Sequence, residues 1–364
     1  MLPFILFGSL AAVGAGSLVY RRRLKALEGP DLSRYGGPRP ADFDVPADSE
    51  GLDRLNTYLT ENFIEPAKIK GPRRESLQKK RDMFDEGGRA RTDPDVEYRA
   101  DKIDFNGKGV SGEWVLVKGY DSGRRLLYLH GGGGTVGSAL SHRALTTNLA
   151  KRTKAAVFAP NYRLMPEHPR RASIEDTRAS YRWILENGPD GPSRAKTVAV
   201  CGDSAGANLS LTLVNWLSRT KRRQADAVYV LSAPTDSTVS SPSLKENFET
   251  DLMLQPLIGP FLKLPRLVLL SGLKKMSGYR PTSPDISPIH DDLSGLPPTL
   301  MQMSTAEMLH DDSVRYANKL REAGSPVILQ SWSRVPHVFQ MFDTYIEAAS
   351  DALDKAGDFL NNHI

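Results

Sequence analysis

Cysteine is nearly absent from this chain of 364 residues. The single thiol, Cys201, excludes an intramolecular disulfide and a thiolate metal cluster, and it leaves the redox compartment open. Neither sign of charge dominates, because 48 basic and 43 acidic residues leave a formal net charge of +5. This diffuse balance does not suggest a nucleic-acid-binding protein. With 40% hydrophobic and 25% charged residues, the chain has the composition and length of one large α/β domain with a smaller appendage.

Long apolar runs are also missing, with one exception at the N-terminus. Residues 2–20 carry no charge, and at about 1.5 Å per residue a helix of that length comes close to crossing the roughly 30 Å hydrocarbon layer of a membrane. Arg21, Arg22 and Arg23 follow at once, whereas no basic side chain precedes the run. This pattern predicts a single-pass membrane anchor in residues 1–20, with the rest of the chain on the cytoplasmic side.

Two alternatives remain for the same segment. The small residues from Ala11 to Gly16 would suit a signal-peptide cleavage site, although a signal peptide normally begins with a basic region that is absent here. A buried N-terminal helix is the other possibility.

The remainder of the chain divides into three parts by composition. The stretch from Gly29 to Pro46 is rich in Pro, Gly and Asp, which predicts a linker in residues 21–48. Helical spacing from Ser49 to Asp85 predicts helices in residues 49–95. In residues 96–364, short apolar runs alternate with amphipathic helices, which predicts a mostly parallel eight-stranded sheet covered by helices. The predicted strands are Tyr98–Phe105, Glu113–Val117, Leu126–Leu129, Ala155–Ala159, Thr197–Cys201, Ala227–Leu231, Thr299–Met303 and Val327–Trp332.

One glycine run, residues 107–112, has the spacing of a dinucleotide-binding loop. It begins within Asn106-Gly107, a hairpin turn signal, and leads into the predicted strand Glu113–Val117. A dinucleotide loop would lead into a helix, whose N-terminus holds the pyrophosphate. The context therefore argues against a nucleotide cofactor.

A second glycine-containing motif has the right context for chemistry. The G-x-S-x-G pattern at residues 202–206 lies between the apolar run Thr197–Cys201 and a helical segment from Ala207 to Arg219. A sharp strand-to-helix turn of this kind exposes a serine hydroxyl at a helix N-terminus, where the dipole favours an oxyanion. The pattern predicts Ser204 as a nucleophile. The motif residues are Gly202, Asp203, Ser204, Ala205 and Gly206.

Four consecutive glycines follow the predicted strand Leu126–Leu129. Without side chains, such a loop can turn its backbone N–H groups toward a substrate. Placed between a strand and a helix, about seventy residues before an elbow serine, the loop predicts an oxyanion hole. The motif residues are His130, Gly131, Gly132, Gly133 and Gly134.

Together these motifs resemble the hormone-sensitive-lipase branch of the α/β hydrolases, a family of carboxylesterases, lipases and deacetylases. Residues 161–169, Ser287-Pro288, Leu296-Pro297-Pro298 and His337-Val338-Phe339 also fit, so the resemblance runs from about Leu126 to the C-terminus. It implies an α/β-hydrolase fold without metal or organic cofactor, with the oxyanion donors at the backbone N–H groups of Gly132, Gly133 and Ala205. One departure is Gly134, where many relatives carry an aromatic residue.

His337 is the predicted base, because it follows the last predicted strand, Val327–Trp332, in the chain order of serine, acid and histidine. Three residues are candidates for the acid that orients it. Glu307 lies on the loop directly after the strand Thr299–Met303, where relatives usually have Asp. Asp311 and Asp312 are alternatives, although acids in the first turn of a helix are also explained by capping.

The remaining histidines are expected to have structural roles. His130 is predicted to shape the glycine loop and His168 to pack in the turn formed by residues 166–169. Surface or capping roles are expected for His142, His290, His310 and His363.

The resemblance also implies a helical cap built from residues 49–95 and an apolar insertion at about residues 235–281, after the sixth strand. The apolar residues of the insertion either pack the cap helices together or line an acyl-binding wall. The predicted activity is hydrolysis of small-molecule or lipid esters of short to medium acyl chains. Two alternatives are an arylacetamide-type amide deacetylase and a non-catalytic receptor on the same fold. The plant gibberellin receptors of the latter class lack the histidine that His337 supplies here.

Overall fold

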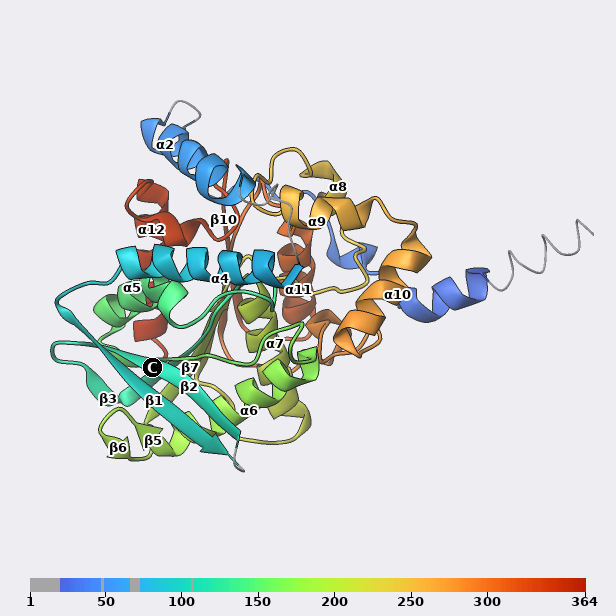
Figure 1. Cartoon of the computed structure of the whole chain (residues 1–364). Helices are drawn as coiled ribbons and strands as arrows, with labels where there is room; N and C mark the ends of the chain where they lie inside the picture. The colour runs from blue at the N-terminus through green and yellow to red at the C-terminus, as the bar shows by residue number, and fades with distance from the viewer. Residues whose placement is uncertain (1–19, 47–48, 66–72, 106–107) are drawn as a thin grey trace, which may run out of the picture.

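An eight-stranded sheet forms the centre of the protein (Figure 1). The computed structural model describes residues 20–46, 49–65, 73–105 and 108–364. The strand order is β1-β2-β4-β3-β7-β8-β9-β10, and all pairs are parallel except β1–β2 and β2–β4. The predicted eight-stranded, mostly parallel sheet is therefore confirmed. The strands are β1 Val96–Phe105, β2 Lys108–Val117, β3 Asp121–Leu129, β4 Ala155–Pro160, β7 Thr197–Asp203, β8 Ala227–Leu231, β9 Thr299–Ser304 and β10 Val327–Trp332.

The two faces of the sheet carry different helices (Figure 1). Alternate residues of the parallel strands point to opposite faces, so Leu127 and Val200 belong to one buried cluster and Leu126 and Cys201 to the other. The first cluster is covered by α6 Arg170–Glu186, α7 Ser204–Arg219 and α11 His310–Glu322, and the second by α5 Arg143–Thr153 and α12 Glu347–Asn361. Short elements complete the domain: the hairpin β5 Asn187–Gly188 and β6 Gly191–Pro192, and the 3₁₀ turns η1 Ser33–Tyr35, η3 Leu140–His142, η4 Pro288–His290 and η5 Phe339–Phe342.

The glycine run at residues 107–112 does not form a dinucleotide loop. Strands β1 and β2 pair antiparallel up to Phe105 and Lys108, so the run from Lys108 onward is strand. Residues 106 and 107 lie outside the described residues.

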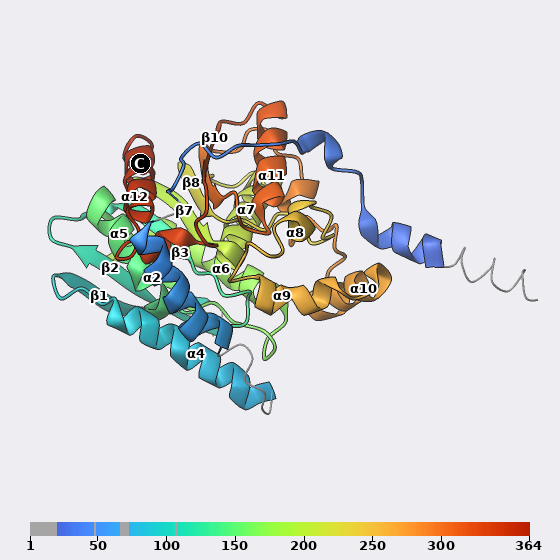
Figure 2. The ribbon, with the colours of Figure 1, turned by 90° about the horizontal axis from the view of Figure 1, so that it is seen from above.

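Two groups of helices lie beside the carboxyl ends of the strands, where the sequence places the predicted cap (Figure 2). The first contains α2 Glu50–Leu59, the π-helical η2 Thr60–Ile64 and α4 Arg73–Ala90, and the second α8 Ser243–Glu246, α9 Gln255–Leu262 and α10 Arg266–Ser277. Arg81 of α4 donates hydrogen bonds to the carbonyl groups of Thr135 and Met165 and to the carboxylate of Glu167. This helix therefore fixes the glycine loop to the segment after β4.

The prediction that residues 21–48 form a linker is wrong for much of that segment. Residues 20–28 are helical, and Leu32, Tyr35 and Val45 are buried against the domain. Phe43 forms a parallel bridge with Trp332 of β10. Proline and glycine break any periodicity here, but single apolar residues still bury their surface on the domain.

The predicted membrane anchor cannot be compared with the structure, because residues 1–19 lie outside the described residues. Among the helices that are described, none is by itself long and apolar enough to cross a membrane. Only α9 and α10 taken together reach that length and composition, and a bend of 120° separates them.

Candidate active site

Ser204 is the first residue of α7, directly after β7. Its φ of +49° lies in the left-handed region, which is strained for a residue with a side chain. The turn is tight because its glycines have no room for a side chain: a Cβ on Gly206 would lie 1.9 Å from the carbonyl oxygen of Leu129, and one on Gly202 2.7 Å from the same oxygen. The small residues of the motif thus allow the turn that presents Ser204.

A chain of two hydrogen bonds joins the three residues that the sequence singled out. The Oε2 atom of Glu307 lies 2.7 Å from Nδ1 of His337, and Nε2 of His337 lies 2.9 Å from Oγ of Ser204. An ionised carboxylate only accepts, so Nδ1 must carry the proton and Nε2 is left to accept from the serine hydroxyl. This is the tautomer that a general base next to a nucleophile requires.

The two other candidate acids point elsewhere. Asp311 accepts a hydrogen bond from the N–H of Ser243, and Asp312 accepts bonds from the N–H groups of Thr235 and Asp236. Both carboxylates hold the start of the insertion after β8 on helix α11. Among the three alternatives, only Glu307 is hydrogen-bonded to His337.

The surroundings of His337 favour its protonated form. Burial by itself lowers the pKa of this imidazole, but the hydrogen bond and charge of Glu307, together with the charges of Asp251 and Asp203, outweigh it and raise the pKa above its ordinary value. The imidazolium that forms when a base accepts a proton is therefore stabilised here.

Asp251 is a residue of the site that the sequence analysis missed. Its side chain is buried, and its Oδ2 atom accepts a 2.8 Å hydrogen bond from the N–H of Met308, next to Glu307. Its Oδ1 atom accepts bonds from the N–H groups of Met253 and Leu254. Asp251 thus ties the acid loop to the start of α9. The only local signal was an aspartate that precedes a helix, which is common for capping.

The glycine loop after β3 has an unusual backbone. Gly132, Gly133 and Gly134 have φ values of +99°, +61° and +69°, which residues with side chains rarely adopt. The N–H groups of Gly132 and Gly133 donate to no acceptor within the described part of the chain. They are free to serve an external oxygen, as is expected of oxyanion donors.

Asp203, the motif residue before the nucleophile, holds this loop. Its Oδ1 atom accepts hydrogen bonds from the Tyr128 hydroxyl at 2.7 Å and from the N–H of Gly131 at 3.0 Å. The Nε2 atom of His142 lies 3.1 Å from the same N–H. His142 is buried, so the expected surface role was wrong. It stands at the N-cap position of α5, but its side chain forms no capping hydrogen bond there. A single polar residue on a short turn gives no sequence signal for burial.

The structure also locates His130 and His168. His130 is buried, stacks on Tyr162 at 4.1 Å between ring centroids, and has its Nδ1 atom 2.8 Å from the carbonyl oxygen of Gly131. It therefore lies where it was predicted to shape the glycine loop. His168 is exposed, so its predicted packing in the turn is wrong.

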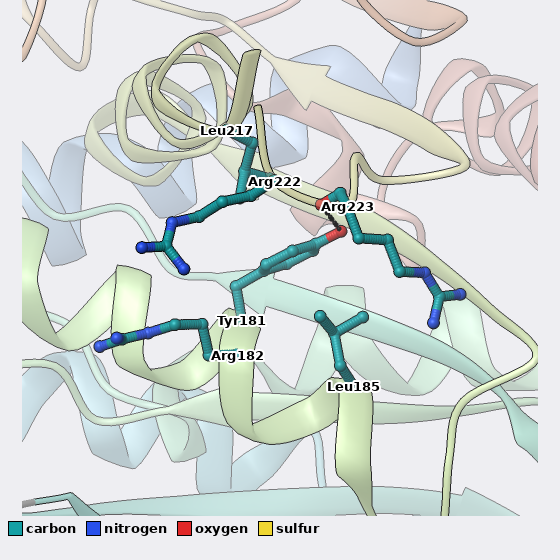
Figure 3. Close-up of a pocket in the computed structure, with 6 residues that line it drawn as sticks. All are labelled: Tyr181, Arg182, Leu185, Leu217, Arg222 and Arg223. Atoms are coloured by element: carbon teal, nitrogen blue, oxygen red, sulfur yellow. Dashed lines mark hydrogen bonds between the residues drawn. The ribbon is translucent and has the colours of Figure 1, made fainter. Parts of the chain in front are cut away.

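A separate pocket lies far from these residues (Figure 3). Its volume is about 260 Å³, and it is lined by Tyr181, Arg182 and Leu185 of α6, Leu217 of α7, and Arg222 and Arg223. Ser204 and Leu217 are thirteen positions apart along α7, which corresponds to about 20 Å. This pocket is therefore no part of the serine site.

Comparison with known proteins agrees with this geometry. Residues 126–341 match the family described as having the alpha/beta hydrolase fold. The chain belongs to this family. It is 35% identical over 248 residues to an acetyl-hydrolase of Streptomyces hygroscopicus, which covers 68% of this chain and 78% of that protein. It is 33% identical over 269 residues to an esterase of Acinetobacter venetianus, with 73% and 82% covered.

A solved structure extends the likeness to the whole fold. An esterase from the bacterial hormone-sensitive lipase family superposes on this α/β hydrolase with a TM-score of 0.73 at 29% identity, covering 88% of this chain and all of that one. The predicted resemblance to that branch of the family is therefore confirmed.

Proposed function

We propose that this α/β hydrolase is a carboxylic ester hydrolase that works through an acyl-enzyme on Ser204. The observation that carries the proposal is the hydrogen-bonded chain from Glu307 through His337 to Ser204. Relatives named esterase and acetyl-hydrolase support it.

In the first half-reaction, Oγ of Ser204 attacks the acyl carbon while Nε2 of His337 takes the hydroxyl proton. Glu307 stabilises the imidazolium. The carbonyl oxygen becomes an oxyanion that accepts hydrogen bonds from the N–H groups of Gly132, Gly133 and Ala205, and one such donor typically contributes 10²–10³ in rate. His337 then returns the proton to the departing alcohol, and the acyl group remains on Ser204.

In the second half-reaction, a water molecule replaces the alcohol. His337 takes one of its protons as the oxygen attacks the acyl-enzyme, and the same oxyanion donors act again. Collapse of the intermediate releases the carboxylic acid and gives the proton back to Ser204. No metal ion or organic cofactor has a step in this sequence.

The proposed substrates are esters of short to medium acyl chains. The relative named acetyl-hydrolase supports a small acyl group. The test is kcat/KM for the full chain across an ester series from acetyl to stearoyl, with Ser204→Ala as the blank. A maximum at short or medium length supports the proposal, and a steady rise to the longest chains would reject it in favour of a lipase.

A matched anilide series separates an esterase from an amide deacetylase. The acyl groups are kept the same and only the leaving group changes from an alcohol to an aniline. Higher kcat/KM for the esters supports the proposal. A higher kcat/KM for the anilides would instead indicate an amide deacetylase. If Ser204→Ala kept both activities, the serine mechanism would be refuted.

For cellular placement, we propose that residues 1–20 anchor the enzyme with its catalytic domain on the cytoplasmic side. The charge-free run at residues 2–20 and the exposed side chains of Arg21, Arg22 and Arg23 support this. The full chain should remain in the membrane pellet through a carbonate wash. Digestion of the domain by protease added outside intact cells would contradict the orientation.

A further inference from the structure

Helices α9 and α10 expose a group of large apolar side chains to solvent. Seven large hydrophobic residues are exposed in the described part of the chain, and five of them belong to residues 257–276. Scattered single residues of this kind need no explanation, but a cluster marks an interaction surface. We call this surface the α9–α10 face; it consists of Leu257, Phe261, Leu264, Val268 and Met276, which are 42–58% exposed.

The segment that carries the α9–α10 face is packed against the rest of the protein on its other side. Leu254, Ile258 and Leu262 of the same segment pack inward on Met308 and Leu309. Helix α9 therefore has an inner side that covers the loop of Glu307. On its outer side, Leu257 and Phe261 lie one turn apart and are 45% and 58% exposed to solvent.

The charged residues of the segment that carries this face all have one sign. From residue 252 to residue 284 the chain has no Asp or Glu. The basic residues of the same stretch are Lys263, Arg266, Lys274, Lys275 and Arg280. Lys274 and Lys275 are exposed and form no ion pair with any described residue. Apolar side chains flanked by lysine and arginine are the pattern of helices that lie in the interface of an anionic membrane.

The start of the described chain lies beside the same helices. The helix at residues 20–28 runs next to α10 in both views (Figures 1 and 2), and Nε of Arg266 donates a 2.7 Å hydrogen bond to Glu28. This helix adds Arg21, Arg22, Arg23 and Lys25 to the basic residues on this side of the molecule. Two segments far apart in sequence thus bring apolar and cationic groups to one side.

We infer that the α9–α10 face docks on the surface of an anionic lipid bilayer. The apolar side chains enter the boundary between headgroups and acyl chains, and the surrounding lysines and arginines pair with lipid phosphates and carboxylates. Docking through the α9–α10 face would set the orientation of the molecule on the bilayer. This docking does not depend on any attachment through residues 1–19.

The single buried cysteine makes a direct test possible. Cys201 is fully buried in β7, and burial raises the pKa of its thiol, so a thiol-reactive dye should not label the native chain. An environment-sensitive dye is attached to the full-length Phe261→Cys and Val268→Cys proteins. The matched control is Ile328→Cys, at an exposed apolar position on β10 outside the face. The vesicles contain phosphatidylcholine and phosphatidylglycerol, with nitroxide-labelled lipid as quencher.

The labels at positions 261 and 268 should be quenched by these vesicles, and the label at 328 should not. Vesicles of phosphatidylcholine alone should quench them less. Lys274→Glu with Lys275→Glu should weaken docking by at least about fivefold at each position, because each change removes a cation and adds an anion. Lys118→Glu, in an exposed turn on another part of the molecule, is the charge control and should have no effect.

Two results would overturn the inference. In the first, the protein floats with the vesicles while the labels at 261 and 268 stay unquenched, which would mean attachment through another segment with this face in water. In the second, the labels respond to protein concentration without vesicles and not to lipid, which would identify a second copy of the chain as the partner.

Discussion

Replacing Glu307 by glutamine tests the orientation of the base most directly. The side chain is buried, and its two oxygens have different partners: Oε1 accepts a 3.0 Å hydrogen bond from the N–H of Ser304, and Oε2 faces Nδ1 of His337 at 2.7 Å. An amide can satisfy only one of these donors. If its oxygen keeps the Ser304 bond, its NH₂ group faces Nδ1, so the imidazole proton must move to Nε2. In that tautomer Nε2 can no longer accept the proton of Ser204.

The opposite orientation of the amide is no better, because it points the NH₂ group at the N–H of Ser304 and leaves two buried donors facing each other. We therefore expect Glu307→Gln to lower kcat on the order of 10⁴-fold, as for the corresponding change in other serine hydrolases, or about 5.5 kcal/mol in the activation barrier. Near-normal thermal unfolding should show that the fold persists. Asp311→Asn is the matched control, because Asp311 bonds to Ser243 and not to His337.

The pH profile gives a second readout of the same change. Burial lowers the pKa of His337, but Glu307 and neighbouring acids raise it above the ordinary value. The base must be neutral, so kcat/KM of the wild type should rise with pH through a midpoint above about 6.5. The residual activity of Glu307→Gln should have its midpoint at lower pH. Full activity in this variant, with loss in Asp311→Asn or Asp312→Asn, would refute the assignment of the acid.

Three further predictions concern the nucleophile, a helix contact and a buried acid. Ser204→Ala should lose activity on the order of 10⁶-fold and resist labelling by a fluorophosphonate, so labelling equal to the wild type would refute the nucleophile. Gly87→Ala should stabilise the protein by about 0.5–1 kcal/mol in thermal unfolding, because a Cβ at this position of α4 meets nothing within 4 Å. Gly88→Ala should destabilise the protein, because its Cβ would lie 1.9 Å from the carbonyl oxygen of Leu140. Equal effects of the two substitutions would contradict the close packing of α4 on Leu140. Burial and the charge of Asp236 raise the pKa of Asp312 to about 7, above its unfolded value near 4. The wild type should therefore lose up to about 4 kcal/mol of stability relative to Asp312→Asn as the pH rises from 4 to 7. A constant difference in unfolding free energy between the two proteins over that range would refute this.

Much of the sheet could be predicted because strand periodicity is a local property. The predicted strand Ala227–Leu231 has the observed bounds of β8, and Ala155–Ala159 falls one residue short of β4. The predicted strand began at Leu126, whereas β3 begins at Asp121. The first five residues were missed because they include no apolar side chain, and all but Arg125 are only partly buried. Polar strand ends lack the apolar pattern on which such predictions depend.

The sequence by itself determined the elbow around Ser204, the glycine loop and the position of His337 after the last strand, because each depends on residue types within a short segment. Only the tertiary structure decided which acid faces His337. Glu307, Asp311 and Asp312 lie within six residues of one another, and the fold points the first at the histidine and the other two at the insertion after β8. The same holds for Asp251 and His142. Their partners are 57 and 11 residues away in the chain, and contacts at such separations exist only once the sheet has brought its loops together.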